Sequence, residues 1–494
     1  MKNLFLFVFL LLIGCEQTPK TTISPWVSYD ESQLLEKNAA HKSKRMQYRL
    51  IQSNVSDRND LWKSIAPQIA SFSKEDYEQL KPFILEQNIP TLQNHVAAGT
   101  LSYEKLTQWY LYRIVLFEND SLKALNAIIS IDPNAVKDAR KKDAKRSESQ
   151  HLLYGIPILL KDNINVEGLP TTAGAHALKN NLTSDAFIVD RLQEKGAVIL
   201  GKTNLSEWAN YLCKACPNGY SAVGGQTLNP YGIREFDTGG SSAGSGAAIA
   251  ANYAAAALGS ETSGSILSPS STHALVGLKP TVGLLSRDGI VPISSTYDTP
   301  GPMAKNVIDA SILLSAMKGE DPNDPITKGN SLASEPKVTF TKKTFEGLRF
   351  GVNKQFLSDS LYKIATLKIK SLGGTLVEFE PENVRLGNFG KVLDADMKID
   401  LKNYLTRFGK SDLLPKSIDD VIHHNSADSL IRMPYSQGRL DGVYASEMSA
   451  DSLAFYKEGL KKQGVAFFET PMRKHNLDVV LSINNWNAGH AAVA

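Results

Sequence analysis

Cysteine is scarce in this chain, with three residues among 494. Cys213 and Cys216 form a lone C-x-x-C pair, and the lack of a second pair argues against a structural zinc site. The pair is interpreted either as a local disulfide or as two unpaired thiols. We expect neither a metal nor another cofactor.

An excess of charge of one sign is also lacking, because 54 Lys and Arg stand against 51 Asp and Glu. Without a basic surplus to neutralise phosphates, no nucleic-acid partner is expected. No glycine/serine-rich or proline-rich linker divides the chain, and its 42% hydrophobic content can form a large core. We therefore expect one main domain with an N-terminal appendage.

The apolar run at residues 4–13 is too short for a membrane span of about 20 residues. Followed by Gly14 and Cys15, it is typical of a signal peptide, residues 1–14, that ends in a lipobox. Similarity to bacterial lipoproteins implies export and a lipid at Cys15, anchored on the outer face of the cytoplasmic membrane or on the outer membrane. A cleaved secretory signal without lipid is the alternative. Residues 15–88 are interpreted as a tether and helical appendage.

Two glycine-rich turns each carry serines, and a lysine lies upstream of both. The turns are GGSSAGSG at residues 239–246 and GSETSGS at residues 259–265, and Lys161 lies in GIPILLKDN. A serine that attacks a carbonyl needs backbone N–H groups near the developing oxyanion, and glycine leaves room for that approach. The alternative is that small residues only allow close packing. All three segments together favour a nucleophile, a bridging hydroxyl and a base.

On these segments the chain resembles the amidase signature family of serine hydrolases, over residues 89–494, the expected catalytic domain. Further family-like motifs are LSEWAN at 205–210, GQTLNPY at 225–231, VGLKPT at 276–281 and DTPGPM at 298–303. Several are similar to the bacterial peptide amidase branch. The resemblance implies an α/β fold with one mixed, twisted β-sheet covered by helices on both faces. It also implies closing strands beyond Ala494, so we expect a C-terminally incomplete chain.

The resemblance further implies a Ser-Ser-Lys relay. Lys161, neutral when it acts, takes a proton through the bridging Ser241 from Ser265, which attacks the amide carbonyl and becomes an acyl-ester. Burial by the apolar residues before Lys161 is expected to lower its pKa from about 10.4. The peptide bond between residues 240 and 241 is expected to be cis.

An oxyanion hole is also implied, formed by the backbone N–H groups of Thr262, Ser263, Gly264 and Ser265. Two departures from the family pattern lie close by. Ala243 stands where glycine is common, and Glu261 and Ser263 stand where many members have Asp and Gly. Ser263 can still offer its backbone N–H if its φ suits a serine. Neither departure is expected to abolish activity.

Two other motifs compete with this interpretation. Residues 240–244 match the G-x-S-x-G nucleophile elbow with Ser242 as nucleophile, but no strand precedes them and no convincing Asp-then-His pair follows. Residues 196–203, GAVILGKT, match the phosphate-loop pattern. Their four central residues are apolar and themselves predict a strand, which argues against nucleotide binding.

Hydrophobic patterns predict helices within residues 29–88 and over 106–117, a buried strand over 197–200, and a small-residue helix over 246–258. The predicted function is hydrolysis of a linear carboxamide, such as a peptide C-terminal amide or a short acyl amide. Two alternatives stay open. One is a non-catalytic amidase-fold lipoprotein that acts as a binding module, and the other is an A subunit of the glutaminyl-tRNA amidotransferase.

Overall fold

The computed structural model describes residues 21–147, 150–329, 344–411 and 413–494. The predicted signal peptide and Cys15 lie outside the described residues. Within these ranges no helix is both long and apolar enough to cross a membrane.

The strands are β1 (Ile128–Ile131), β2 (Pro157–Lys161), β3 (Val198–Thr203), β4 (Tyr220–Ser221), β5 (Gly225–Gln226), β6 (Ala256–Glu261), β7 (Val276–Gly277), β8 (Thr299–Ala304), β9 (Arg349–Asn353), β10 (Thr375–Phe379) and β11 (Val479–Leu481).

The α-helices are α1 (Ser32–Ala39), α2 (Asn59–Ile69), α3 (Lys74–Ile84), α4 (Ile89–Ala97), α5 (Tyr103–Glu118), α6 (Ala135–Ala144), α7 (Phe187–Glu194), α8 (Glu207–Asn210), α9 (Ala243–Ala250), α10 (Leu267–Thr272), α11 (Val307–Met317), α12 (Ser360–Ser371), α13 (Phe389–Phe408), α14 (Ile418–Ser426), α15 (Ser429–Arg432), α16 (Gly438–Tyr444), α17 (Ala450–His475) and α18 (Ala488–Val493). Short 3₁₀ helices are η1 (Lys44–Met46), η2 (His176–Leu178), η3 (Pro325–Thr327) and η4 (Lys354–Phe356).

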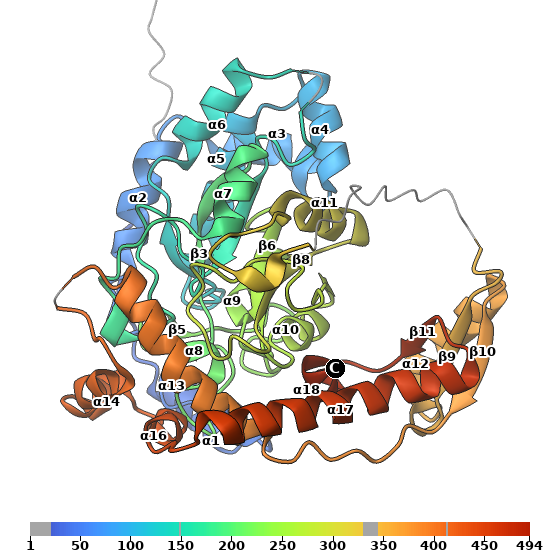
Figure 1. Ribbon diagram of the computed structural model, residues 1–494. Helices are drawn as coiled ribbons and strands as arrows, with labels where there is room; N and C mark the ends of the chain where they lie inside the picture. Colours follow the sequence, from blue (N-terminus) through green and yellow to red (C-terminus); the bar gives the residue numbers. More distant parts are fainter. Residues whose placement is uncertain (1–20, 148–149, 330–343, 412) are drawn as a thin grey trace, which may run out of the picture.

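In the described chain, the largest sheet has six strands in the order β1-β3-β2-β6-β8-β7 and lies at the centre of Figure 1. Strands β3, β2 and β6 are parallel, whereas β1, β8 and β7 join antiparallel to their neighbours. Every residue of β2, β3, β6 and β8 is buried, as in strands covered on both faces. The predicted α/β fold with one mixed, helix-flanked sheet is confirmed.

The direction of strand addition reverses at β2. From β2 the chain passes through α7 to β3, and from β3 it passes through α9 to β6 on the other side of β2. Because such crossovers are right-handed, α7 and α9 cover opposite faces of the sheet. The carboxyl ends of β2 and β6 therefore lie side by side at a topological switch point, where open α/β sheets bind ligands.

The predicted helix over residues 246–258 is wrong in its second half. Helix α9 ends at Ala250, Asn252 adopts a φ of 58°, and residues 256–261 form the central strand β6. Alanine favours a helix locally, but small side chains also allow a strand to lie between two others beneath a close-packed helix. Tertiary packing, rather than local preference, therefore determines the secondary structure of residues 256–261.

The other predicted elements are present. The helix predicted over 106–117 lies within α5, and the strand predicted over 197–200 overlaps β3, which begins at Val198. Because β3 continues to Thr203, the last residues of the phosphate-loop-like motif are strand residues. They are not free to wrap around a phosphate.

Of the helices between residues 29 and 88, α2 packs on strand β1 of the main sheet and on α5, and α3 packs on α5. Trp62 and Ile65 of α2 and Tyr77 of α3 are buried in the same core as the residues of β2 and β6. Figure 1 shows α2, α3 and α4 beside α5 and α6, at the end of the molecule opposite the long helix α17.

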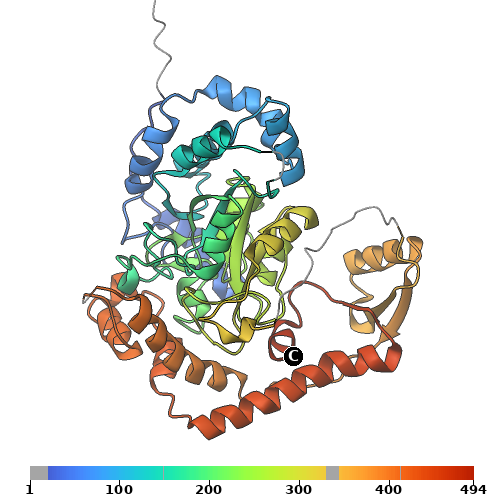
Figure 2. The ribbon, with the colours of Figure 1, turned by 45° about the horizontal axis from the view of Figure 1, so that its top comes forward.

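A second, three-stranded sheet has the order β10-β9-β11, with both strand pairs parallel. In Figures 1 and 2 helix α17 runs from the group of α13, α14 and α16 towards this small sheet. Helix α13 packs against α16 and α17. Its first turns reach the switch point of the main sheet, where they take part in the site described next.

Candidate active site

The amine of Lys161 lies at the carboxyl end of β2 and is entirely buried. Its Nζ donates hydrogen bonds to Ser241 Oγ at 2.7 Å, Ser260 Oγ at 2.9 Å and the Ser260 carbonyl at 3.1 Å. Strand β2 supplies the lysine, the turn before α9 supplies Ser241, and the end of β6 supplies Ser260. The switch point thus brings together three segments that lie far apart in the sequence.

Burial lowers the pKa of Lys161 to about 7, because removal from water penalises the charged ammonium. The carboxylates of Asp298 and Glu261 act in the opposite direction, since a negative charge favours the protonated amine. At neutral pH a large share of the protein therefore holds Lys161 as a free base.

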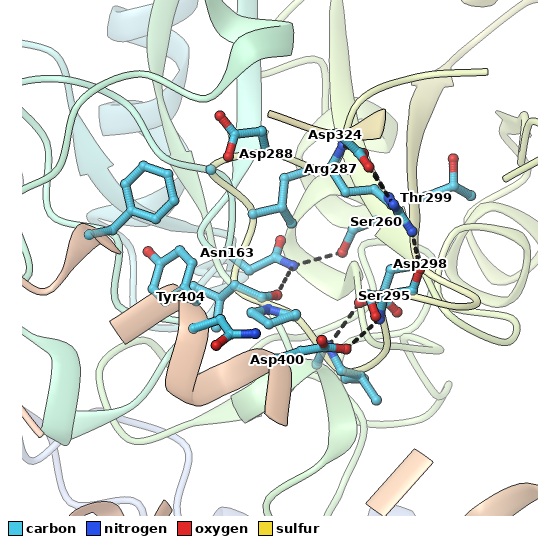
Figure 3. Close-up of a pocket in the computed structure, with 18 of the residues that line it drawn as sticks. Asn163, Ser260, Arg287, Asp288, Ser295, Asp298, Thr299, Asp324, Asp400 and Tyr404 are labelled. Atoms are coloured by element: carbon cyan, nitrogen blue, oxygen red, sulfur yellow. Dashed lines mark hydrogen bonds and ion pairs between the residues drawn. The ribbon is translucent and has the colours of Figure 1, made fainter. Parts of the chain in front are cut away.

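Ser260 and Asn163 complete the surroundings of this amine. The Asn163 amide donates to Ser260 Oγ at 2.9 Å, a contact drawn in Figure 3. A neutral amine has two N–H groups and one lone pair, and Ser260 offers two acceptors, its Oγ and its carbonyl. In the neutral form the third direction, towards Ser241, is left for the lone pair, which can accept from the Ser241 hydroxyl, whereas in the ammonium form Nζ donates to Ser241 Oγ.

The sequence analysis missed Ser260 and Asn163 as site residues. The pattern did contain a clue, because Asn163 lies in the same K-D-N run as Lys161 and Ser260 lies inside the second glycine turn. That the two turns meet over this lysine follows from the sheet order, which local patterns do not encode.

The first turn positions Ser241 through a cis peptide bond between Gly240 and Ser241, as the family resemblance implied. Ser241 is fully buried, and its carbonyl accepts from the Ser206 N–H at 2.9 Å. The two turns are also joined directly, because the Ser242 N–H donates to the Ser265 carbonyl at 3.1 Å. Movement of one turn therefore moves the other.

Ser265 faces a cavity of about 300 Å³, which Gly240, Thr262 and Ser263 also line. Within the described residues the Ser265 hydroxyl has no hydrogen bond to Ser241, so the structure brings together Lys161 and Ser241 but not the complete chain of hydroxyls. Ser242, the rival nucleophile, is fully buried and donates to the Ser260 carbonyl at 3.2 Å. Of these two serines, only Ser265 lines this cavity.

The backbone N–H groups predicted to form an oxyanion hole fall into two sets. Among described residues, those of Thr262, Ser263 and Ser265 donate to no protein acceptor. The Gly264 N–H instead donates to the Glu261 carboxylate at 2.7 Å. Three donors thus remain free beside the cavity.

Glu261 organises the second turn from inside. Its two carboxylate oxygens accept from the backbone N–H groups of Gly264, Ile266 and Leu267 at 2.7, 2.8 and 3.0 Å. The side chain is 1% exposed, so these contacts lie in a medium of low dielectric constant, where charge-assisted hydrogen bonds are strong. Gly264 has a φ of +89°, which a side chain would strain.

A second cavity of about 230 Å³ adjoins the first, since Ala209, Thr262 and Ile293 line both, and Figure 3 shows residues of its lining. Ser260 and Asn163 form part of its wall. Asp298, also in the wall, accepts from the Ile293 and Ser294 N–H groups, and burial raises its pKa to about 6.

A buried ion pair fixes the strand ends beside Lys161. Lys202 Nζ lies 3.1 Å from Asp162 Oδ1, and both side chains are 0% exposed. Lys202 is the lysine of the phosphate-loop-like motif, and it also donates to Thr171 Oγ1 at 3.1 Å. The Lys202 amine therefore contacts partners inside the protein core.

Cys213 and Cys216 form a disulfide, which resolves the two alternatives left by the sequence. Both residues line the cavity that contains Ser265. Among described residues, no group of three or more His, Cys, Asp or Glu side chains is placed to hold a metal ion.

These features define an α/β protein whose switch point holds a buried lysine amine, a serine hydrogen-bonded to it and a second serine open to a cavity. The profile of the Amidase family matches residues 106–482, and the chain belongs to this family.

Curated relatives include a probable amidase of Arabidopsis thaliana, 40% identical over 319 residues, or 61% of this chain. The A subunit of the glutamyl-tRNA(Gln) amidotransferase of Microcystis aeruginosa is 40% identical over 264 residues, or 51% of this chain. The chain spans only 61% and 53% of the lengths of these two relatives.

Solved structures match over more of the chain. An amidase family protein from Bacillus anthracis has a TM-score of 0.84 at 32% identity and covers 90% of this chain and 89% of its own. The peptide amidase from Stenotrophomonas maltophilia has a TM-score of 0.75 at 35% identity and covers 83% of this chain and 89% of its own.

Replacing Glu261 with Gln tests the role of its carboxylate. The amide oxygen can accept from part of the turn, but the amide N–H₂ then faces a backbone N–H, which leaves buried donors unpaired. We expect the free energy of unfolding to fall by about 1–3 kcal/mol in denaturant titrations. Glu235→Gln, at an exposed glutamate, is the matched control. Equal stability of both variants would contradict the role assigned to Glu261.

Proposed function

We propose that this protein is an amidase that hydrolyses linear carboxamides through an acyl-ester on Ser265. The observation that carries the proposal is the 2.7 Å hydrogen bond between Lys161 and Ser241, made by a buried amine whose pKa is about 7. Membership of the Amidase family supports the same chemistry.

In the proposed reaction, the lone pair of Lys161 accepts the proton of Ser241 as Ser241 accepts the proton of Ser265. Ser265 Oγ then bonds to the amide carbonyl carbon, and the free N–H groups of Thr262, Ser263 and Ser265 stabilise the oxyanion. The proton returns through Ser241 to the leaving nitrogen as the C–N bond breaks. Water, deprotonated by the same relay, hydrolyses the ester and releases the acid.

For the relay to operate, the Ser265 hydroxyl must turn towards Ser241. We propose that a rotation of the Ser265 side chain brings the two hydroxyls together while the Ser242 N–H continues to donate to the Ser265 carbonyl. Hydrogen bonds of this type commonly tighten only when substrate is bound.

Within this class we propose a peptide C-terminal amide or a short acyl amide as substrate. The structural similarity to the peptide amidase of Stenotrophomonas maltophilia supports this choice. The similarity to an amidotransferase A subunit supports acyl transfer from an amide but does not distinguish the two functions. Hydrolysis without a partner subunit or tRNA would distinguish them.

A fluorophosphonate probe tests the nucleophile without knowledge of the substrate. We expect mass spectrometry to find the label on Ser265, none in Ser265→Ala, and labelling slowed by roughly 10²–10⁴-fold in Lys161→Ala, which lacks the base. Ser242→Ala is the matched control and should retain the label on Ser265. Label on Ser242 in the parent chain would instead support the nucleophile-elbow interpretation, and no label would support a binding module.

The pH dependence tests the base. Because only neutral Lys161 accepts a proton and its pKa is about 7, the labelling rate should rise roughly tenfold per pH unit below this value and level off above it. In Asp298→Asn the loss of a carboxylate that raises the pKa of Lys161 should move the midpoint to lower pH. A rate independent of pH, or a midpoint that moves upwards in this variant, would contradict the assignment.

We also propose that the protein is exported and carries a lipid at Cys15, on the evidence of the apolar run and lipobox at residues 4–15. When the full chain is expressed in a bacterium with labelled palmitate, we expect lipid on the wild-type protein and partition into the detergent phase. Cys15→Ser should lose both properties. Label retained in this variant, or none in the wild type, would refute the anchor.

A further inference from the structure

The cavity that contains Ser265 has an unusual charge distribution. Arg45, Lys214 and Arg439 line it, whereas no described residue of its lining is Asp or Glu. Within the described chain none of these three cations takes part in an ion pair. Positive charge therefore faces the cavity without a neutralising partner.

Neutral groups hold these cations in position. The Arg45 guanidinium donates to Asn218 Oδ1 at 2.7 Å, and the Arg439 guanidinium lies 5.1 Å from the centre of the Tyr211 ring. Lys214 lies between the two disulfide-bonded cysteines, so a covalent loop keeps it at the cavity. These contacts orient the side chains without placing a carboxylate in direct ion-pair contact with them.

The carboxylate of Asp394 and the guanidinium of Arg439 both interact with Tyr211, but the two side chains form no direct ion pair. The Asp394 carboxylate accepts a hydrogen bond from the Tyr211 hydroxyl at 2.8 Å and does not line the cavity. The lining of the cavity also includes the apolar side chains of Ile293, Phe389 and Leu393.

We infer that the amide substrate carries a carboxylate close to an apolar group, and that Arg45, Lys214 and Arg439 bind this carboxylate. The inference rests on the proposed amidase function and names its substrate class, acidic peptide amides. Guanidinium groups match the planar geometry of a carboxylate, and a cavity of one sign of charge concentrates ligands of the other sign. The apolar wall would receive the neighbouring side chain.

A matched pair of substrates tests this class. N-acetyl-Glu-Leu-amide and N-acetyl-Gln-Leu-amide differ only in charge, so the ratio of their kcat/KM values reports binding of the carboxylate. We expect the acidic amide to be favoured about tenfold at low ionic strength. The ratio should approach one in about 0.5 M NaCl, because salt screens partly exposed charges.

Variants locate the interaction. Arg439→Gln and Lys214→Gln should each lower the ratio by about twofold to fivefold, and Arg439→Lys should restore part of it because the charge is retained. Lys44→Gln, which removes a neighbouring exposed cation outside the lining, is the matched control and should leave the ratio unchanged. A loss of folding would lower both kcat/KM values together without changing their ratio.

The outcomes separate the two claims. Turnover of both amides at equal kcat/KM would overturn the carboxylate preference and leave the amidase function intact. A preference that persists in Arg45→Gln, Lys214→Gln and Arg439→Gln combined would overturn the assignment to these residues. Failure to hydrolyse any amide of the series would overturn the proposed function, and this inference with it.

Discussion

The site depends on an amine kept out of water at the end of a buried strand. In solvent, lysine is protonated at neutral pH and cannot accept a proton. Here Lys161 is 0% exposed, and its contacts are hydroxyl and carbonyl oxygens rather than carboxylates. Neutral acceptors satisfy its N–H groups without stabilising the ammonium as strongly as a direct ion pair would. Lys202, on the neighbouring strand β3, differs in its partner: its amine lies 3.1 Å from the carboxylate of Asp162, which opposes the lowering of its pKa by burial.

That arrangement requires the backbone around Ser241 to pack closely against neighbouring segments at two glycines. Gly244 at the start of α9 packs so tightly that an added Cβ would lie 2.3 Å from the Asn204 carbonyl oxygen. An added Cβ at Gly240 would lie 2.6 Å from Ser206 Oγ. Glycine at these positions lets the turn that carries Ser241 sit directly over β2. The glycines in the first motif thus serve packing and chemistry together, so the two explanations weighed for the sequence are not exclusive.

Much of the site could be predicted from the sequence, because its main residues lie in short motifs that resemble one family. The same motifs could not reveal Ser260 and Asn163 as partners of Lys161, since these contacts arise only when β2 and β6 become neighbours. The prediction of a helix over residues 246–258 was wrong for a related reason. Alanine-rich composition indicates a local preference for helix, whereas pairing with the neighbouring strands makes the second half of this segment a strand. The engagement of the Gly264 N–H by Glu261 was equally invisible, because it depends on a side-chain direction within the turn.

The negative and positive side chains around the site occupy different places: the carboxylates are buried beside Lys161, and the cations line the cavity that contains Ser265. Glu261 and Asp298 are buried; the oxygens of Glu261 accept from backbone N–H groups, and those of Asp298 accept from two backbone N–H groups and the Thr262 hydroxyl. Both carboxylates raise the pKa of Lys161, and neither lines the cavity that contains Ser265. The uncompensated charges that face this cavity are cationic and come from η1, the disulfide loop and α16. A ligand in this cavity therefore shares it with three cationic side chains, so its own charge affects binding more directly than the buried carboxylates do.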